Sequence, residues 1–224
     1  MHLLSLPWRV LATEDAYFAD PSYERENFAF LDTVLPKKDG VFVDIGAHQG
    51  LFSTYLSQRA GPDGLVYAFE PNPDNLKLLI YNTAHRPGLA PVVIFPMALA
   101  EKNYAGKLQC WRSERPLHSA MCQLGTKEAS DFEIPIIVRT LDSLHLPKMD
   151  FIKIDVEHWE WKVIEGGMDT ILAHRPQMLI EIHNNETREQ IQTFAGQHFF
   201  DCEYRHACVY GVQARCEYLY LKSR

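Results

Sequence analysis

VFVDIGAHQG, at residues 41–50, joins a short apolar run to a turn that contains two glycines. The run Val41–Ile45 is β-branched and apolar except for Asp44, which is typical of a strand buried on both faces of a parallel sheet. Gly46 and Gly50 allow the backbone to turn and to approach a ligand closely, because neither carries a Cβ atom. The following residues have the pattern of an amphipathic helix. The stretch therefore predicts a strand, a tight turn and a helix, with a ligand at the start of the helix.

A second apolar run, Leu65–Phe69, ends in Glu70. A carboxylate at the carboxyl edge of a strand can accept hydrogen bonds from both hydroxyls of a ribose. A nicotinamide site would normally have three glycines spaced G-x-G-x-x-G, whereas only Gly46 and Gly50 are present. Asp44 would repel a pyrophosphate but suits the cationic end of S-adenosylmethionine. We therefore predict an S-adenosylmethionine site. A purely structural turn is the alternative, which a buried carboxylate in need of a partner disfavours.

Downstream of this turn, apolar runs of strand length alternate with segments of helical periodicity. We expect strands at residues 41–45, 65–70, 91–95, 151–156 and 178–182, and helices at residues 23–35, 51–60, 73–84, 159–173 and 186–196. Residues 199–204 and 217–221 indicate an antiparallel pair of strands. This order predicts an α/β fold with a mostly parallel, doubly wound sheet and an antiparallel C-terminal strand pair.

We expect a single domain over residues 1–224, because the sequence contains no repeat, low-complexity tract or linker rich in serine and glycine. Residues 1–38 are predicted to form an N-terminal cap on the cofactor cleft, and residues 40–224 the core. After the third predicted strand, the pattern changes to short strand-like pieces around a polar stretch. That stretch, near residues 112–131, is predicted to be a substrate loop.

The composition narrows the classes of partner and the compartment. The formal net charge is −7 and no long basic run is present, so we do not expect nucleic acid as the main partner. Residues 1–10 are apolar but lack a basic start, and Glu14 and Asp15 follow, so we expect neither a secretory signal nor a membrane span. We therefore predict a cytoplasmic protein. Nothing in the sequence indicates an oligomer.

The cysteines give no sign of a metal site or of a disulfide framework. There are five of them, an odd number, and no pair has the C-x-x-C spacing. Reduced thiols in a cytoplasmic protein are the expectation.

Several segments together resemble the FkbM-type methyltransferases, which are class I enzymes dependent on S-adenosylmethionine. They are VDIGAHQGLFS at 43–53, FEPNPDN at 69–75, TLDSL at 140–144, FIKIDVEHWEWKVIEGG at 151–167 and RPQMLIEIH at 175–183. The resemblance implies a Rossmann-like fold and O-methylation of hydroxyls, often on sugars or secondary-metabolite scaffolds. It also implies that Ser119 lies near the cofactor. The family usually has a glycine after the acidic pair, where this chain has His158 and Trp159.

The predicted strands end in an unusual number of ionisable residues. Asp155 and Glu157 lie at the end of the fourth strand, and Glu181 and His183 at the end of the fifth. Ligands of parallel α/β sheets bind outside the carboxyl ends of the strands, and residues two apart in an extended strand point to one side. We therefore expect these four candidate catalytic residues to converge on one ligand. Lys153 shares their side, so part of the group can instead be a salt-bridge network.

Methyl transfer to an alcohol requires alignment of the donor and removal of a proton. A general base contributes roughly 100- to 10,000-fold, and the ordinary histidine pKa of about 6.5 suits this role. We predict His183 as the base, with Asp155 or Glu157 positioning the acceptor or assisting. Alternatively, His183 only caps the next helix or bonds a loop carbonyl. A metal held by these carboxylates and His183 is a further alternative, but the spacing is not diagnostic and we assign no metal ligand.

The sequence thus predicts a methyltransferase that acts on a hydroxyl of a small molecule, sugar or secondary metabolite. The predicted cofactor-binding residues are Asp44, Gly46, Ala47, His48, Gly50, Glu70, Asn72, Met97, Ala98, Ser119 and Asp155. N-methylation of a peptide or small amine is the alternative reaction. A non-catalytic nucleoside-binding scaffold is the alternative outside enzymes, because architecture does not fix activity.

Overall fold

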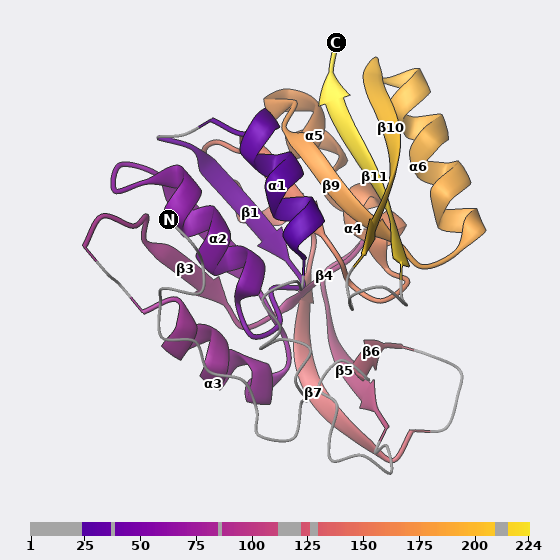
Figure 1. The fold of residues 1–224 in the computed structure, drawn as a ribbon. Coiled ribbons are helices and arrows are strands. Elements are labelled where there is room, and N and C mark those ends of the chain that lie inside the picture. The colour runs from indigo at the N-terminus through magenta and orange to yellow at the C-terminus, as the bar shows by residue number, and fades with distance from the viewer. Residues whose placement is uncertain (1–23, 37–38, 85–86, 112–121, 126–129, 209–214) are drawn as a thin grey trace.

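A sheet of seven strands organises the protein in a computed structural model that describes residues 24–36, 39–84, 87–111, 122–125, 130–208 and 215–224 (Figure 1). The strand order is β10-β11-β9-β8-β1-β2-β3. The strands are β1 Val41–Ile45, β2 Leu65–Phe69, β3 Val92–Phe95, β8 Phe151–Ile154, β9 Gln177–Ile182, β10 Phe200–Cys208 and β11 Arg215–Ser223. β11 runs opposite to the other six strands of this sheet and pairs antiparallel with both β9 and β10. The predicted parallel sheet and its antiparallel C-terminal pair are therefore confirmed.

Helices cover both faces of this sheet, so that the protein has three layers (Figure 1). One face carries α1 Arg25–Val34, α2 Leu51–Ala60 and α3 Pro73–Asn82, and the other α4 Glu160–Glu165, α5 Met168–His174 and α6 Asn185–Gln197. Successive β1 residues alternate between the layers: Phe42 packs with Leu56 of α2, and Val43 belongs to the core that contains Ile164 of α4. Burial on both faces explains why β1 is almost wholly apolar.

A second, smaller sheet extends from the carboxyl end of the main sheet (Figure 1). Its order is β4-β7-β5-β6, with β4 Ala98–Leu99, β5 Tyr104–Cys110, β6 Cys122–Leu124 and β7 Phe132–Arg139. The sequence predicted strand-like pieces here but not a separate sheet. Exposed and less exposed residues alternate along most of β7, as expected of an antiparallel sheet with one solvated face. A short 3₁₀ helix, η3 Asp142–Leu144, leads back to β8.

The helix predicted over residues 159–173 is wrong in its continuity, because α4 and α5 are separate helices. A Cβ atom on Gly166 would lie 2.0 Å from the carbonyl oxygen of Ala100, so the chain between the helices is pressed against the start of the second sheet. Asp142 then stabilises the new helix start, since its carboxylate accepts a hydrogen bond of 2.8 Å from the backbone N–H of Thr170.

Three sequence predictions lie wholly or partly outside the described residues. They are the N-terminal cap before residue 24, most of the substrate loop at 112–131, and Ser119 near the cofactor. The helix expected at 23–35 is α1. None of the helices in the described ranges combines the length and the apolar character that crossing a membrane requires.

The close approach at Gly166 predicts a specific cost for adding one methyl group. Gly166→Ala should lower the free energy of unfolding by about 1–3 kcal/mol, because the contact is with backbone that must move. Gly196→Ala in α6 is the matched control, since nothing lies within 4 Å of its Cβ position. The control should be neutral or stabilising by about 0.5–1 kcal/mol in urea unfolding. Equal effects of the two substitutions would contradict this account of the break.

Candidate functional site

A cavity of about 190 Å³ opens where β1, β2, β8 and β9 end and the smaller sheet begins. Eight residues from the predicted cofactor set line it: Gly46, Ala47, His48, Glu70, Asn72, Met97, Ala98 and Asp155. Glu157 and Glu181 from the predicted catalytic set also line it. Asp44, Gly50 and His183 are not among the lining residues. The cavity therefore brings together most of the residues predicted from the strand ends.

The turn after β1 is shaped by close backbone packing. Gly46 has a φ of 79°, and a Cβ atom there would lie 1.8 Å from the carbonyl oxygen of Asp155. No other residue fits this position without moving β8. Gly50 has a φ of 91° and faces Leu79 of α3, so its contribution is to helix packing and not to the cavity wall.

Glu70 is held at one end of the cavity by the backbone of two loops. Its Oε2 accepts a hydrogen bond of 2.8 Å from the N–H of His48, and its Oε1 accepts one of 2.8 Å from the N–H of Asn72. Burial raises the pKa of Glu70 to about 7, although these hydrogen bonds act to lower it. Oε1 also accepts a hydrogen bond of 3.4 Å from Asn75 Nδ2, so Oε2 is the oxygen that keeps a lone pair for a ligand hydroxyl.

Asp44 has its partners inside the protein and not in the cavity. It is fully buried, and its Oδ2 accepts a hydrogen bond of 2.6 Å from the Ser53 hydroxyl. The ammonium of Lys153 lies 3.6 Å from Asp44 Oδ1 and 3.2 Å from Asp155 Oδ2, and it donates a hydrogen bond of 2.9 Å to Gly46 O. The position of Asp44 therefore does not fit a direct contact with the cationic end of a cofactor, and its influence passes through Lys153.

Three carboxylates surround one nitrogen of His183. The imidazole Nε2 lies near an oxygen of each: Asp155 at 4.0 Å, Glu157 at 3.7 Å and Glu181 at 3.8 Å. The other nitrogen, Nδ1, lies 2.8 Å from Oε1 of Glu160, which is fully buried at the start of α4. The buried carboxylate thus fixes the ring so that Nε2 faces the three acidic groups.

The charges around His183 change the role that the sequence suggested. Burial lowers its pKa, but the hydrogen bond to Glu160 and the charges of Glu160 and Asp155 raise it to about 10. At neutral pH the ring is therefore an imidazolium and not the free base that was predicted. Burial and the nearby charge of Asp155 raise the pKa of Glu157 to about 7 and that of Glu181 to about 8. These two carboxylates line the cavity and are better placed to accept a proton.

The backbone between β8 and α4 is left-handed at two successive residues that are not glycine. Glu157 has a φ of 52° and His158 a φ of 76°. Position 158 is where the resembling family usually has glycine, and its conformation gives the physical reason. The His158 N–H donates a hydrogen bond of 3.1 Å to Glu160 Oε1, so this turn also positions the carboxylate that holds His183.

Two features of the cavity were missed in the sequence. Glu24, buried at the start of α1, lines the cavity with a pKa raised to about 7 by burial, and no motif marks it. Cys110 and Cys122 form a disulfide, so the expectation of reduced thiols is wrong for this pair. The two cysteines are 12 residues apart and meet only through the register of β5 and β6, which the sequence did not reveal.

Three of the predicted catalytic residues lie close enough to share a metal ion. Ligand atoms of Asp155, Glu181 and His183 lie within 4.8 Å of one another, a spacing that a divalent cation can bridge.

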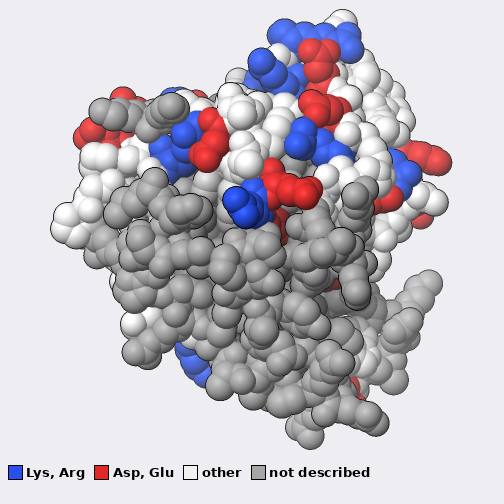
Figure 2. Space-filling view, viewed as in Figure 1, with Lys and Arg blue, Asp and Glu red and all other residues white. Residues whose placement is uncertain are grey.

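On the face shown in Figure 2, the basic side chains of the described residues are interspersed with acidic ones. That part of the surface therefore gives no electrostatic support for a nucleic-acid partner.

The sequence of this chain is similar to those of known methyltransferases. The model of the methyltransferase FkbM domain matches residues 44–210. The hexuronic acid methyltransferase AglP of Haloferax volcanii is 29% identical over 153 residues, which are 66% of this chain and 57% of that protein. This chain thus spans little more than half the length of that relative.

Two solved structures show the same fold. The methyltransferase FkbM from Methylobacillus flagellatus superimposes with a TM-score of 0.58 at 18% identity, covering 85% of this chain and 46% of that one. Fibrillarin from Aeropyrum pernix, solved with natively bound S-adenosyl-L-methionine, gives a TM-score of 0.51 at 14% identity, covering 88% and 74%. Both likenesses support the class I Rossmann-like architecture.

The position of Lys153 generates a stability prediction. Lys153→Met should lower the free energy of unfolding by about 3–5 kcal/mol, because it leaves two carboxylates without their buried cation. Lys153 acts to lower the pKa values of both Asp44 and Asp155 in the folded protein, so its loss raises both relative to the unmodified protein. The folded variant then binds more protons than the folded unmodified protein, so its stability deficit should grow as pH rises above the unfolded aspartate pKa of about 4.

Lys77→Met is the control for this measurement, since Lys77 is 74% exposed and pairs only with Asp74 on the surface of α3. Its loss should change stability by less than about 1 kcal/mol. Chemical unfolding at several pH values checks both variants, and a Lys153→Met deficit that is independent of pH would contradict the ion-pair account.

Proposed function

Because the chain belongs to the FkbM family of methyltransferases, we propose that it transfers the methyl group of S-adenosylmethionine to a hydroxyl of a small molecule or sugar. The observation that carries this proposal is the joint lining of one cavity by Glu70 and the glycine turn after β1 at one end and by Asp155, Glu157 and Glu181 at the other. Glu70 and the glycine turn suit a nucleoside. The three carboxylates suit the cationic sulfur of the cofactor and an acceptor that carries a proton.

The residues present fit the cofactor. Glu70 is oriented by the backbone N–H groups of His48 and Asn72, and its Oε2 keeps a lone pair for a ribose hydroxyl. Gly46 allows the turn after β1 to pack against the backbone of Asp155, and Met97 and Ala98 supply an apolar wall for a base. When bound, the cofactor supplies an electrophilic methyl group on a positively charged sulfur. The carboxylates near the other end favour that charge.

The protein's own groups account for the proton. In O-methylation the acceptor oxygen gains a methyl group and loses its hydrogen, while the sulfur keeps the electrons of the broken S–C bond. Glu181, with a pKa of about 8, accepts the proton in this proposal, and Glu157 orients the acceptor. The His183 imidazolium limits the repulsion among the carboxylates and is a positioning residue, since it does not line the cavity.

The acceptor class rests on family membership and on one relative. AglP is a hexuronic acid methyltransferase, which supports a sugar as the acceptor. N-methylation of an amine and a scaffold without turnover remain the competing functions. Use of a divalent cation is a variant of the O-methylation proposal, supported by the 4.8 Å grouping of Asp155, Glu181 and His183.

The cofactor assignment predicts a binding measurement. S-adenosylmethionine and S-adenosylhomocysteine should both bind in calorimetry, and Glu70→Ala should raise Kd about ten- to a hundredfold by removing hydrogen bonds to a charged group. Glu165→Ala, which removes a surface partner of Lys162, should leave Kd unchanged. Absence of binding would refute the proposed function. Binding without turnover on a broad panel of sugars and alcohols would favour the scaffold.

The base assignment predicts a pH profile. A base must be deprotonated, so kcat/KM for S-adenosylmethionine, which reports the free enzyme, should rise with pH and level off above about 8. The corresponding rise in kcat should occur at lower pH, because a bound cation favours the ionised carboxylates. Glu181→Gln should lower kcat roughly 100- to 10,000-fold and abolish the rise. A labelled methyl donor with an acceptor from the sugar and alcohol panel provides the assay.

Glu165→Gln is the control for that profile and should behave as the unmodified protein. A Glu181→Gln enzyme that keeps both its rate and its pH dependence would reject Glu181 as the base. A small effect with an amine acceptor would indicate N-methylation, since a neutral amine needs no base to be nucleophilic. Loss of turnover in EDTA, restored by Mg²⁺ or Mn²⁺, would identify the metal-assisted variant.

A further inference from the structure

The disulfide joins β5 to β6, a short strand that few residue pairs hold on the sheet. Strand β6 has three residues and lies at the edge of the smaller sheet, paired with β5 through Leu108–Leu124, Gln109–Gln123 and Cys110–Cys122. The covalent bond closes the last of these pairs. Three residue pairs and this covalent bond are therefore the links between β6 and β5 in the described residues, and the bond fixes their register.

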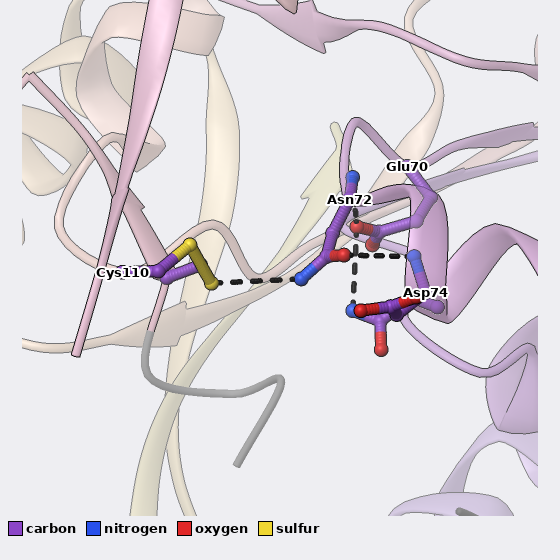
Figure 3. Close-up of a disulfide and its surroundings, with 6 residues drawn as sticks. Glu70, Asn72, Asp74 and Cys110 are labelled. Carbon is purple, nitrogen blue, oxygen red and sulfur yellow. Dashed lines mark hydrogen bonds between the residues drawn. A yellow bond between two sulfur atoms is a disulfide. The ribbon is translucent and has the colours of Figure 1, made fainter. Parts of the chain in front are cut away.

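This hairpin is a wall of the cofactor cavity at the nucleoside end. Leu108, Cys122 and Leu124 line the cavity, and Cys122 Sγ lies 3.5 Å from Asn72 Nδ2, which donates to it. The Asn72 N–H in turn donates to Glu70 Oε1 (Figure 3). The sulfur bridge is therefore one hydrogen-bonded residue away from the carboxylate assigned to the ribose.

The same hairpin reaches the acidic end of the cavity. The Cβ position of Gly125, directly after β6, lies 3.4 Å from Cζ2 of Trp159, a lining residue that precedes α4. Leu124 and Trp159 pack in one hydrophobic cluster with Leu108. A shift of β6 would therefore change the cavity at the nucleoside end and beside Trp159.

We propose that the Cys110–Cys122 disulfide is a redox-controlled support of the cofactor site. A dithiol reductant converts the S–S bond into two thiols and is itself oxidised to a disulfide, so electrons and protons balance. Reduction removes the covalent link between β5 and β6 and releases β6, which weakens cofactor binding. This inference rests on the proposed function, because it takes the cavity as the cofactor site.

The position of the two sulfurs adds a reciprocal consequence. Cys110 is 1% exposed, whereas Cys122 lines the cavity, so a reductant reaches the bond from the cavity side. A cofactor in the cavity covers that approach. Binding and reduction oppose each other, since linkage between two equilibria acts in both directions.

Calorimetry with S-adenosylhomocysteine on the full chain, before and after reduction by dithiothreitol, tests the proposal. Reduction should raise Kd at least about tenfold, and Cys110→Ser/Cys122→Ser should show the reduced-state Kd with or without dithiothreitol. Cys202→Ser is the matched control, because Cys202 is an exposed free thiol in β10 and its loss should preserve the response. Mass spectrometry after alkylation counts the thiols, and S-adenosylhomocysteine should slow the reduction.

Equal Kd values for oxidised and reduced protein would overturn the proposal, as would a reductant response that survives in the double variant. If the double variant does not fold, the comparison of the two states of the unmodified chain still decides. Failure of the oxidised protein to bind would refute the proposed function instead. Hydrogen exchange then tests the support itself: amides 122–124 should exchange faster after reduction, and unchanged protection would reject it.

Discussion

The site depends on the ion pairs that the buried ammonium of Lys153 forms with two carboxylates. The ammonium lies between Asp44 of β1 and Asp155 after β8, and it also binds the carbonyl of Gly46. These contacts join two neighbouring strand ends to the turn that forms the cavity floor. Because Asp44 is inaccessible and Asp155 lines the cavity, one cation balances a structural and a functional carboxylate together. The fold and the chemistry of this edge cannot be separated.

The negative charge that Lys153 leaves unbalanced determines which ligands the cavity can bind. Asp155, Glu157, Glu181 and Glu24 line the cavity, and the imidazolium of His183 lies behind this lining. Burial, together with the excess of negative charge, raises the pKa of Glu181, and for this reason we propose Glu181 and not His183 as the base. A positively charged sulfur or a divalent cation would relieve that repulsion, whereas an anionic group would increase it.

The sequence predicted the strand ends well because parallel strands deliver consecutive motifs to one edge. Glu70, Asp155 and Glu181 follow from that rule alone. Asp44 was misplaced, although the alternation along β1 puts it on the same face as Phe42, towards α2 and Ser53. The disulfide was not predicted, because it depends on the register between β5 and β6, and no turn motif in the sequence indicates that these strands pair. The protonated state of His183 depends on Glu160, which comes from a helix and not from a strand end.

At position 158 this chain has a strained histidine where the resembling family usually has glycine. A left-handed residue other than glycine costs of order 1–3 kcal/mol, and here two follow each other. Glycine would relieve the strain at 158, but it would remove an imidazole whose ring lies 5.2 Å from that of His183. The turn also directs Glu157 into the cavity. His48, whose N–H binds Glu70, is also left-handed with a φ of 51°, so strained backbone borders the cavity at the nucleoside end as well as at the acidic end.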